Sequence, residues 1–201
     1  MMLTADLLLA FILFAFVSSI TPGPNNTMLL SSGVNFGFNR TIPHMLGISC
    51  GFALMVLAVG FGLGAVFKAY PIVYTVLRYA GAAYLLYLAH KIATSGPASD
   101  SEQTNARPMS YLSAAAFQWV NPKAWVMAIG AISTYTPMNG YFTNVAIIAL
   151  VFGIVNLPAV SLWAGFGSLL RNVLRDPLWL RVFNGVMAAL LVLSLYPLLE
   201  Q

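Results

Sequence analysis

Two short polar segments interrupt apolar stretches of helical length, and they hold the side chains best suited to binding a small polar molecule. The first is Thr21-Pro22-Gly23-Pro24-Asn25-Asn26, and the second, about 100 residues later, is Asn121-Pro122-Lys123. Proline removes a backbone N–H and clashes with the preceding helical turn, so each segment is expected to break its helix. In hydrocarbon, the freed backbone groups must be received by protein or by a wet cavity.

Lys123 is the one charged side chain that the sequence places near the centre of an apolar helix. An ammonium there costs about 2.5–3.5 kcal/mol on insertion scales, so it normally faces a cavity and has a partner. The candidate partners are backbone carbonyls released by Pro122 or an anionic group of a substrate. A carboxylate of this chain is not expected, because the five acidic residues fall near span ends or in loops: Asp6, Asp100, Glu102, Asp176 and Glu200. Alternatively, the helix starts earlier or tilts, and Lys123 reaches the cytoplasmic interface.

Asparagines in or beside the apolar segments add neutral donors and acceptors, and half-helices that start after each break direct free N–H groups inward. A small zwitterion fits this set. Its carboxylate would meet Lys123 or a helix N-terminus, and its ammonium would meet asparagine oxygens and loose carbonyls. The alternative, that the asparagines only join helices, stays open, above all for Asn156, where Pro158 also predicts a kink. The candidate substrate-binding residues are Pro22, Gly23, Pro24, Asn25, Asn26, Asn121, Pro122, Lys123 and Asn156.

The remaining reactive side chains indicate neither an enzyme nor a metal site. His44 and His90 lie at the ends of apolar stretches and are expected at the membrane interface, although His44 could titrate in a transport cycle. Cys50, the only cysteine, is expected to pack in a helix. Nucleophile–base motifs and acid-rich metal clusters are missing from the sequence, so we expect no enzymatic activity and no cofactor.

Composition assigns the chain to the lipid bilayer. Hydrophobic residues make up 60% of the 201 residues and charged residues only 7%, whereas soluble domains carry about 25% charged residues. The apolar runs are long and do not alternate with polar residues, which predicts helices rather than the strands of a barrel. Basic residues do not cluster among aromatic ones, so nucleic acid is not an expected partner.

The elements that must position the two polar segments are six predicted transmembrane helices, each needing about 20 residues. We expect an all-α membrane protein whose spans cover roughly 5–36, 42–66, 71–92, 111–135, 143–169 and 178–199, the first and fourth being broken. A polar loop at about 95–108 divides this single domain, residues 1–201, into half repeats of about 1–94 and 109–201. Three spans per half turn the second half upside down, which predicts a 3+3 inverted repeat.

Basic residues in the short loops predict the orientation. Six of them collect on one side and only Lys68 and Arg78 on the other, which places the first side in the cytoplasm and both termini in the periplasm; the six are Arg40, Lys91, Arg107, Arg171, Arg175 and Arg181. Glycines recur at helix-packing spacing, as Gly47 with Gly51, Gly60 with Gly64 and Gly165 with Gly167. These pairs could join helices of one chain or of two, so a homo-oligomer is left open.

Several of these residues resemble the signatures of the LysE/RhtB family of bacterial amino-acid exporters. The opening signature is matched by the segment from Thr21 to Asn26 followed by Gly33, Gly37, Gly47 and Gly51, and the third- and fourth-span motifs by Gly81-Ala82-Ala83-Tyr84-Leu85, Leu88, Phe117 and Asn121-Pro122-Lys123. The resemblance runs from about residue 6 to 195. It implies six helices, an inner-membrane location, and export of amino acids or close derivatives driven by the proton gradient.

The segment from Lys91 to Ser95 resembles the cysteine and O-acetylserine exporter branch of this family. One departure concerns coupling: some relatives carry an acid in the fifth span, where this chain has Asn156. Without a buried carboxylate, the sequence does not name a proton-carrying residue.

The expected function is therefore an inner-membrane secondary transporter that exports small amino acids or their derivatives, with protons as coupling ion. Two alternatives remain from the sequence. One is a channel-like conduit for small polar solutes, built around the same helix breaks. The other is a non-transporting scaffold subunit whose polar residues only pack helices.

Overall fold

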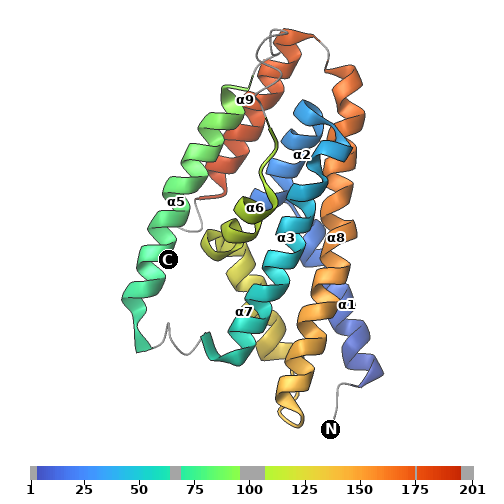
Figure 1. Ribbon diagram of the computed structural model, residues 1–201, viewed down its shortest axis with the longest axis vertical. Coiled ribbons are helices and arrows are strands. Elements are labelled where there is room, and N and C mark those ends of the chain that lie inside the picture. Colours follow the sequence, from blue (N-terminus) through green and yellow to red (C-terminus); the bar gives the residue numbers. More distant parts are fainter. Residues whose placement is uncertain (1–3, 64–68, 96–106, 175, 196–201) are drawn as a thin grey trace.

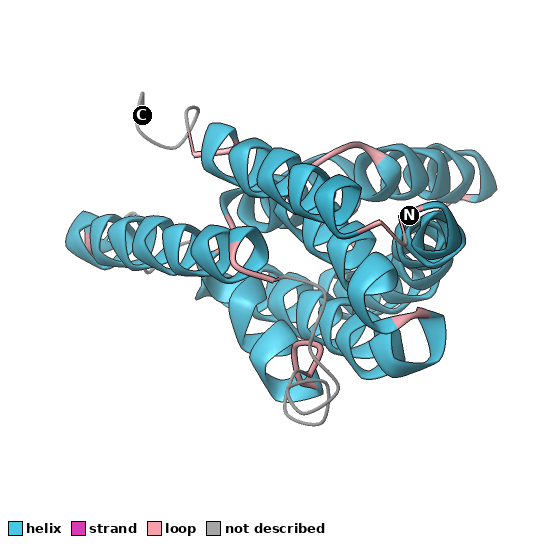
Figure 2. Cartoon of the chain, turned by 90° about the horizontal axis from the view of Figure 1, so that it is seen from above, coloured by secondary structure: helices cyan, strands magenta, loops and turns pink. Residues whose placement is uncertain are grey.

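The computed structural model describes residues 4–63, 69–95, 107–174 and 176–195, and within these residues it contains helices and loops only (Figure 2). The first half of the chain forms α1 (Ala5–Ile20), α2 (Pro24–Phe36), α3 (Phe38–Ala58) with a π-helical turn η1 (Val59–Leu63), and α5 (Pro71–Ala93). The second half forms α6 (Tyr111–Phe117) with a 3₁₀ turn η2 (Gln118–Val120), then α7 (Pro122–Tyr135), α8 (Tyr141–Val173) and α9 (Pro177–Leu193). The polar loop expected at about 95–108 falls mainly on residues 96–106, outside the described residues.

The all-helical prediction is confirmed for the described residues, and two helices are long and apolar enough to cross a membrane: Phe38–Leu63 and Tyr141–Val173. The bent pair of α1 and α2 adds a third if it counts as one span. α9 has 17 residues, and α6 and α7 have 7 and 14, so each alone is shorter than the roughly 20 residues that a span needs. Six spans and the inverted repeat stay predictions.

The first helix is broken where the two prolines predict. α1 ends at Ile20, α2 starts at Pro24, and their axes differ by 57°. Pro24 occupies the first helical position of α2, where its missing N–H is not needed. The bend turns the residues between the helices away from regular backbone bonding, so their carbonyls depend on other donors.

The fourth helix is broken at Asn121, immediately before Pro122. The chain tightens to the 3₁₀ turn η2, Asn121 is extended (φ −88°, ψ 110°), and Pro122 starts α7. The proline ring disfavours a helical conformation in the residue before it, which explains why the break falls there. Pro158 behaves differently, because α8 runs through it from Tyr141 to Val173 without a break.

α8 is the helix against which α1, α2 and α3 pack, while α5 and α9 lie side by side at the other edge of the molecule (Figure 1). Aromatic rings fill the contact between α1, α3 and α8: Phe152 meets Phe52 edge-on at 4.7 Å between centroids and Phe11 at 5.4 Å. The aromatic contacts fix α1 and α3 on α8, and so fix the ends of the first break.

Backbones approach most closely at glycines, and these approaches join the two halves of the chain. A Cβ on Gly33 would collide with the Ala164 carbonyl and one on Gly167 with the Leu30 carbonyl, so α2 and α8 touch backbone to backbone. Gly47 and Gly51 likewise bring α3 against α6. These glycines therefore pack within one chain. Gly165 has open space around its Cβ position, and Gly64 lies outside the described residues.

α2, α5 and α8 end, and α3 and α9 begin, toward the upper end of Figure 1, and the described basic residues predicted to be cytoplasmic lie in or near these helix ends, apart from Arg107, which precedes α6. Contacts join these ends directly. Asn184 of α9 donates to the Ser95 carbonyl after α5 at 2.6 Å and exchanges amide hydrogen bonds with Asn35 of α2 at 3.1 and 3.4 Å. That these helix ends lie together agrees with the distribution of basic residues among the loops. Arg175 and Lys68 lie outside the described residues.

The two glycines of α8 provide a matched test of helix packing. Gly167→Ala forces α2 and α8 apart, and we expect a loss of about 1–3 kcal/mol, the usual cost of overpacking. Gly165→Ala adds the same methyl group two residues away without a neighbour, and should be neutral or gain up to about 1 kcal/mol of helix propensity. Thermal unfolding in detergent measures both. Equal melting temperatures for the two variants would contradict the close α2–α8 contact.

Candidate functional site

The two helix breaks meet at one point, and the Lys123 ammonium joins them. Its Nζ donates to the Thr21 carbonyl at 2.6 Å, the Thr21 hydroxyl at 2.9 Å and the Pro22 carbonyl at 3.3 Å. These three oxygens match the three hydrogens of an ammonium. The partner is thus a set of backbone carbonyls, as expected, but they come from the first break rather than from Pro122. Lys123 is half-buried and its ammonium is held by the first break, and its depth in the membrane stays a prediction.

The Thr21 and Pro22 carbonyls belong to the frayed end of α1, where every carbonyl from Val17 to Gly23 accepts a hydrogen bond. The donors come from α2, α7, α8 and the break itself: Thr21 N and Oγ1, Asn26 Nδ2, Trp163 Nε1, Lys123 Nζ and Thr27 N. A cation at a helix C-terminus is also favoured by the helix dipole. The break is therefore satisfied by protein, as the apolar surroundings require.

Asn26 donates both hydrogens of its amide to the first break. Its Nδ2 donates to the Ser19 and Thr21 carbonyls, both at 2.8 Å, and the residue is buried. An amide offers two N–H donors, and these two carbonyls accept both of them. The structure therefore assigns this asparagine to holding α2 against the end of α1.

A reciprocal pair of amides joins the first break to the second. Asn25 Nδ2 donates to Gln118 Oε1 at 2.8 Å, and Gln118 Nε2 donates back to Asn25 Oδ1 at 3.2 Å. Gln118 is 0% exposed and also donates to the Ala114 carbonyl at 2.9 Å. Gln118 was not among the predicted site residues, although a carboxamide in an apolar run three residues before a broken helix is a signal that could have found it.

The other two asparagines hold their own helices in place. Asn121 caps α7, accepting from the Lys123 backbone N–H at 3.2 Å. Asn156 of α8 donates to the Ser19 hydroxyl of α1 and accepts from the Ser49 hydroxyl of α3, both at 3.0 Å. Asn156 thus links three helices around the first break, and its polar atoms have partners within the chain.

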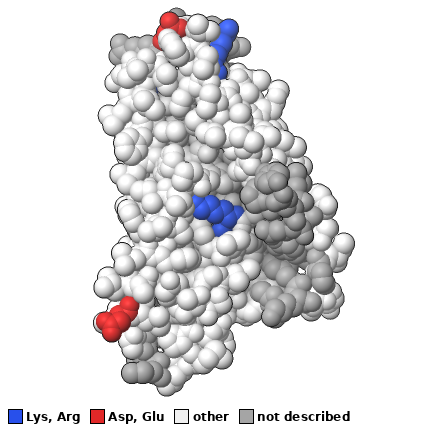
Figure 3. All heavy atoms as spheres, turned by 180° about the vertical axis from the view of Figure 1, so that it is seen from behind, with Lys and Arg blue, Asp and Glu red and all other residues white. Residues whose placement is uncertain are grey.

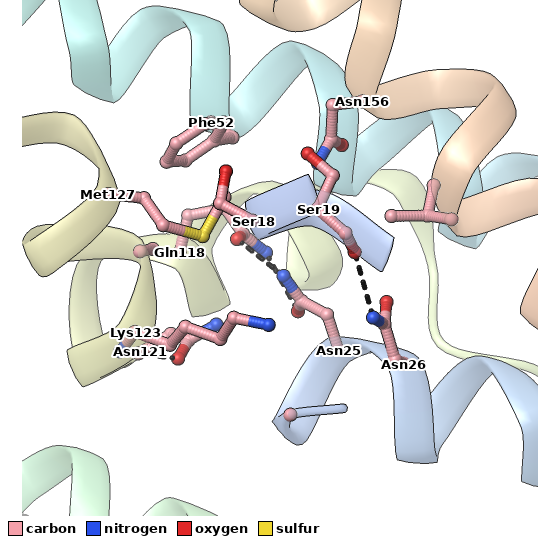
Figure 4. A pocket seen from close by; sticks show the side chains of 13 residues that line it. Ser18, Ser19, Asn25, Asn26, Phe52, Gln118, Asn121, Lys123, Met127 and Asn156 are labelled. Atoms are coloured by element: carbon pink, nitrogen blue, oxygen red, sulfur yellow. Dashed lines mark hydrogen bonds between the residues drawn. The ribbon is translucent and has the colours of Figure 1, made fainter. Parts of the chain in front are cut away.

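These residues surround a small cavity of about 20 Å³, shown in Figure 4. Its polar wall carries Ser18, Ser19, Gly23, Asn25, Asn26, Gln118, Asn121, Lys123 and Asn156, and its apolar wall Phe52, Ala124, Met127 and Val160. Lys123 is the one ionisable side chain among them. A volume of this size holds a water molecule and is far too small for an amino acid.

Gly23 lies under the Lys123 side chain. A Cβ at position 23 would come within 2.8 Å of Lys123 Cδ and 3.2 Å of its Nζ. The backbone of Gly23 is fully extended, a conformation that any residue adopts, so the need for glycine is one of space. Any side chain here would move the ammonium away from the carbonyls.

The predicted residues are therefore brought together, with different roles. Gly23, Asn25, Asn26, Asn121, Lys123 and Asn156 line the cavity, Pro22 supplies a carbonyl, and Pro24 and Pro122 start the two half-helices. Ser18, Ser19, Phe52 and Met127 also line it and were not predicted. His44 is outside the cavity and, instead of facing an interface, is buried with neither ring nitrogen hydrogen-bonded.

Comparison with known proteins gives a family and close relatives. A family model described as a LysE type translocator matches residues 16–195. The chain is 33% identical over 194 residues to the cysteine/O-acetylserine efflux proteins of Escherichia coli strain K12 and Shigella sonnei strain Ss046, with 94% of this chain and 96% of each relative covered. The corresponding protein of Escherichia coli O139:H28 is 32% identical over the same length. No solved structure matches the chain.

The Asn25–Gln118 pair predicts a measurable coupling between the breaks. Asn25→Ala leaves the buried Gln118 amide without its partner and Gln118→Ala the half-buried Asn25 amide, and each should destabilise the fold by about 1–3 kcal/mol. The double variant should cost less than the sum of the two, because the second change removes a group that the first has already orphaned. Unfolding in mixed detergent measures the cycle. Strict additivity would show that the two amides do not depend on each other.

Proposed function

The chain belongs to the LysE type translocator family, and on this premise we propose that it exports small neutral amino acids or their derivatives across the bacterial inner membrane. It is a transporter and not an enzyme. The observation that supports the substrate class is the convergence of two broken helices on a cavity whose single ionisable side chain is Lys123.

The ends of the first broken helix offer opposite partial charges a few residues apart. The carbonyl end of α1 attracts an ammonium, and the N-terminus of α2, which no side chain caps, attracts a carboxylate. An α-amino acid carries these two groups on one carbon atom. We propose that the substrate lies across the break, its carboxylate toward the N-terminus of α2 and its ammonium toward the carbonyls of Thr21 and Pro22.

The lining also limits the substrate side chain. The cavity has no acidic residue to balance a cationic side chain, so lysine- and arginine-like substrates are disfavoured. Hydroxyls and amides face a wall of Phe52, Met127 and Val160, which fits a short side chain of mixed polarity. Cysteine and O-acetylserine, the substrates in the names of the relatives, have this character, and we propose them as substrates here.

Binding requires the two breaks to move apart, because the cavity is water-sized. The contacts that must change are those of Lys123 with Thr21 and Pro22 and of Asn25 with Gln118. In alternating access they would open toward one side of the membrane at a time. We further propose the six-span 3+3 inverted repeat, the periplasmic position of both termini, and the proton gradient as energy source.

A channel-like conduit and a scaffold subunit are the competing functions. A conduit would need an open path, whereas the hydrogen bonds between the breaks close this one. A scaffold would transport nothing. Flux measurements separate the three, because only a transporter saturates and exchanges labelled for unlabelled substrate across the membrane.

We expect purified protein in liposomes to exchange labelled O-acetylserine for internal unlabelled O-acetylserine, with saturation. Asn25→Ala should lower this exchange at least tenfold, because it removes a cavity amide and the contact with Gln118. Asn139→Ala is the matched control, since Asn139 is exposed in the loop before α8 and should exchange like the wild type. Linear, non-saturating flux would indicate a conduit, and no flux with any amino acid would indicate a scaffold.

Competition tests the charge argument. Unlabelled cysteine and serine should inhibit O-acetylserine exchange, whereas lysine and arginine at the same concentration should not, because nothing in the cavity neutralises their side chains. Equal inhibition by lysine and by serine would contradict the proposed substrate class while leaving transport itself intact.

A further inference from the structure

A proton-coupled exporter needs a group that gains and loses a proton at the substrate site, and the cavity offers one. Six elements contribute to its lining: α1, α2, α3, η2, α7 and α8. The side chains that they bring are hydroxyls, amides and apolar groups, with Lys123 as the single ionisable one. The described carboxylates are distant in the chain and lie at helix starts: Asp6 in the first turn of α1 and Asp176 at the N-cap of α9.

The surface view supports this isolation. On the face drawn in Figure 3, one basic patch lies at mid-height with no acidic atoms beside it, and a second basic patch and the acidic atoms lie near the top or low on the molecule. A positive charge in the middle of an apolar protein, held only by neutral oxygens, can be discharged without leaving an opposite charge behind. A salt-bridged lysine could not, because its partner would be left buried and charged.

The oxygens that hold Lys123 are those that a substrate ammonium would use. The Thr21 carbonyl, the Thr21 hydroxyl and the Pro22 carbonyl receive all three ammonium hydrogens. An amino acid lying across the break needs the same acceptors for its own three hydrogens. Two ammonium groups cannot occupy one set of three oxygens, both for lack of acceptors and because like charges repel at this distance.

We propose that Lys123 is the proton-carrying residue of transport, and that the substrate ammonium replaces the Lys123 ammonium at the carbonyls of the first break. This inference rests on the proposed function of an amino-acid exporter. Loading from the cytoplasm breaks one N–H bond of Lys123, and the proton passes to water on that side while the neutral amine withdraws. After the substrate leaves on the far side, the amine takes a proton from water there and returns to Thr21 and Pro22.

The exchange conserves protons, and it explains why substrate export is coupled to proton entry. Each cycle moves one zwitterion outward and one proton inward, with no other bond made or broken. A carrier with neither ammonium in place would remove the Lys123 donor from the Pro22 carbonyl and the Thr21 hydroxyl and leave the Thr21 carbonyl with Asn26 alone, which is costly where water is scarce. The empty, deprotonated form is therefore disfavoured, so the protein does not return without a proton.

The test uses labelled O-acetylserine and purified protein in liposomes with an acidic lumen, where outward protons should drive substrate inward. The wild type should accumulate substrate, and Lys123→Gln should lose at least tenfold of this accumulation, with its remaining uptake independent of the pH gradient. Glutamine keeps an amide donor for the carbonyls but carries no titratable proton. Lys91→Gln is the matched control: Lys91 is exposed at the end of α5, over the Tyr87 ring, and its loss should change neither measurement.

Lys123→Arg provides a second variant that does not depend on the first one folding. Arginine stays protonated in proteins, so this variant should keep the contact with the first break and unfold like the wild type. It should lose accumulation, and it should also lose the release of about one proton per bound substrate, which a pH dye measures in weakly buffered detergent. Proton release by Lys123→Arg, or undiminished accumulation by Lys123→Gln, would overturn the proposal. Absence of counterflow in the wild type would instead refute the exporter function itself.

Discussion

The bond between Lys123 and the carbonyls of Thr21 and Pro22 is the interaction on which the rest of the site depends. It solves two problems of an apolar protein together, because an ammonium and a frayed helix end each need a partner that hydrocarbon does not offer. The other contacts follow from it. Gly23 leaves room for the lysine stem, Asn121 caps the helix that carries it, and Asn26 donates to the Ser19 carbonyl and shares the Thr21 carbonyl with Lys123.

Because of the same interaction, the site needs only one charged side chain. Neutral groups surround one cation, and the electrostatic preference comes from helix ends instead of carboxylates. In the proposed binding mode, such a site would distinguish molecules by where their charges lie, because an amino acid would fit between the ends of α1 and α2 only with its carboxylate and ammonium close together. Phe52, Met127 and Val160 would then limit the size of the rest of the molecule.

How far the sequence predicts these features depends on the range of the interaction. Prolines act on their own backbone, so the breaks at Pro24 and Pro122 were predictable from local chemistry, and the absence of acids from the apolar runs already excluded a salt bridge for Lys123. Pairings between distant helices were not predictable from local chemistry. That Lys123 reaches the first break, that Gln118 meets Asn25, and that His44 is buried depend on how α2, α3 and α6 pack. Pro158 is the opposite case: its local chemistry predicts a kink, whereas the surrounding helices keep α8 continuous across it.

The close glycine contacts also bear on how the protein is made. Gly33, Gly47 and Gly51 belong to the first half of the chain, but the backbones that fit against them belong to α6 and α8. The ribosome delivers the first half earlier, so these glycines cannot meet their partner backbones until the later helices are made. During that interval Asn25 and Asn35 lack Gln118 and Asn184, and the unfinished chain exposes amides to which a membrane chaperone or protease could bind. The contacts between the two halves thus form late, when the last helices are inserted.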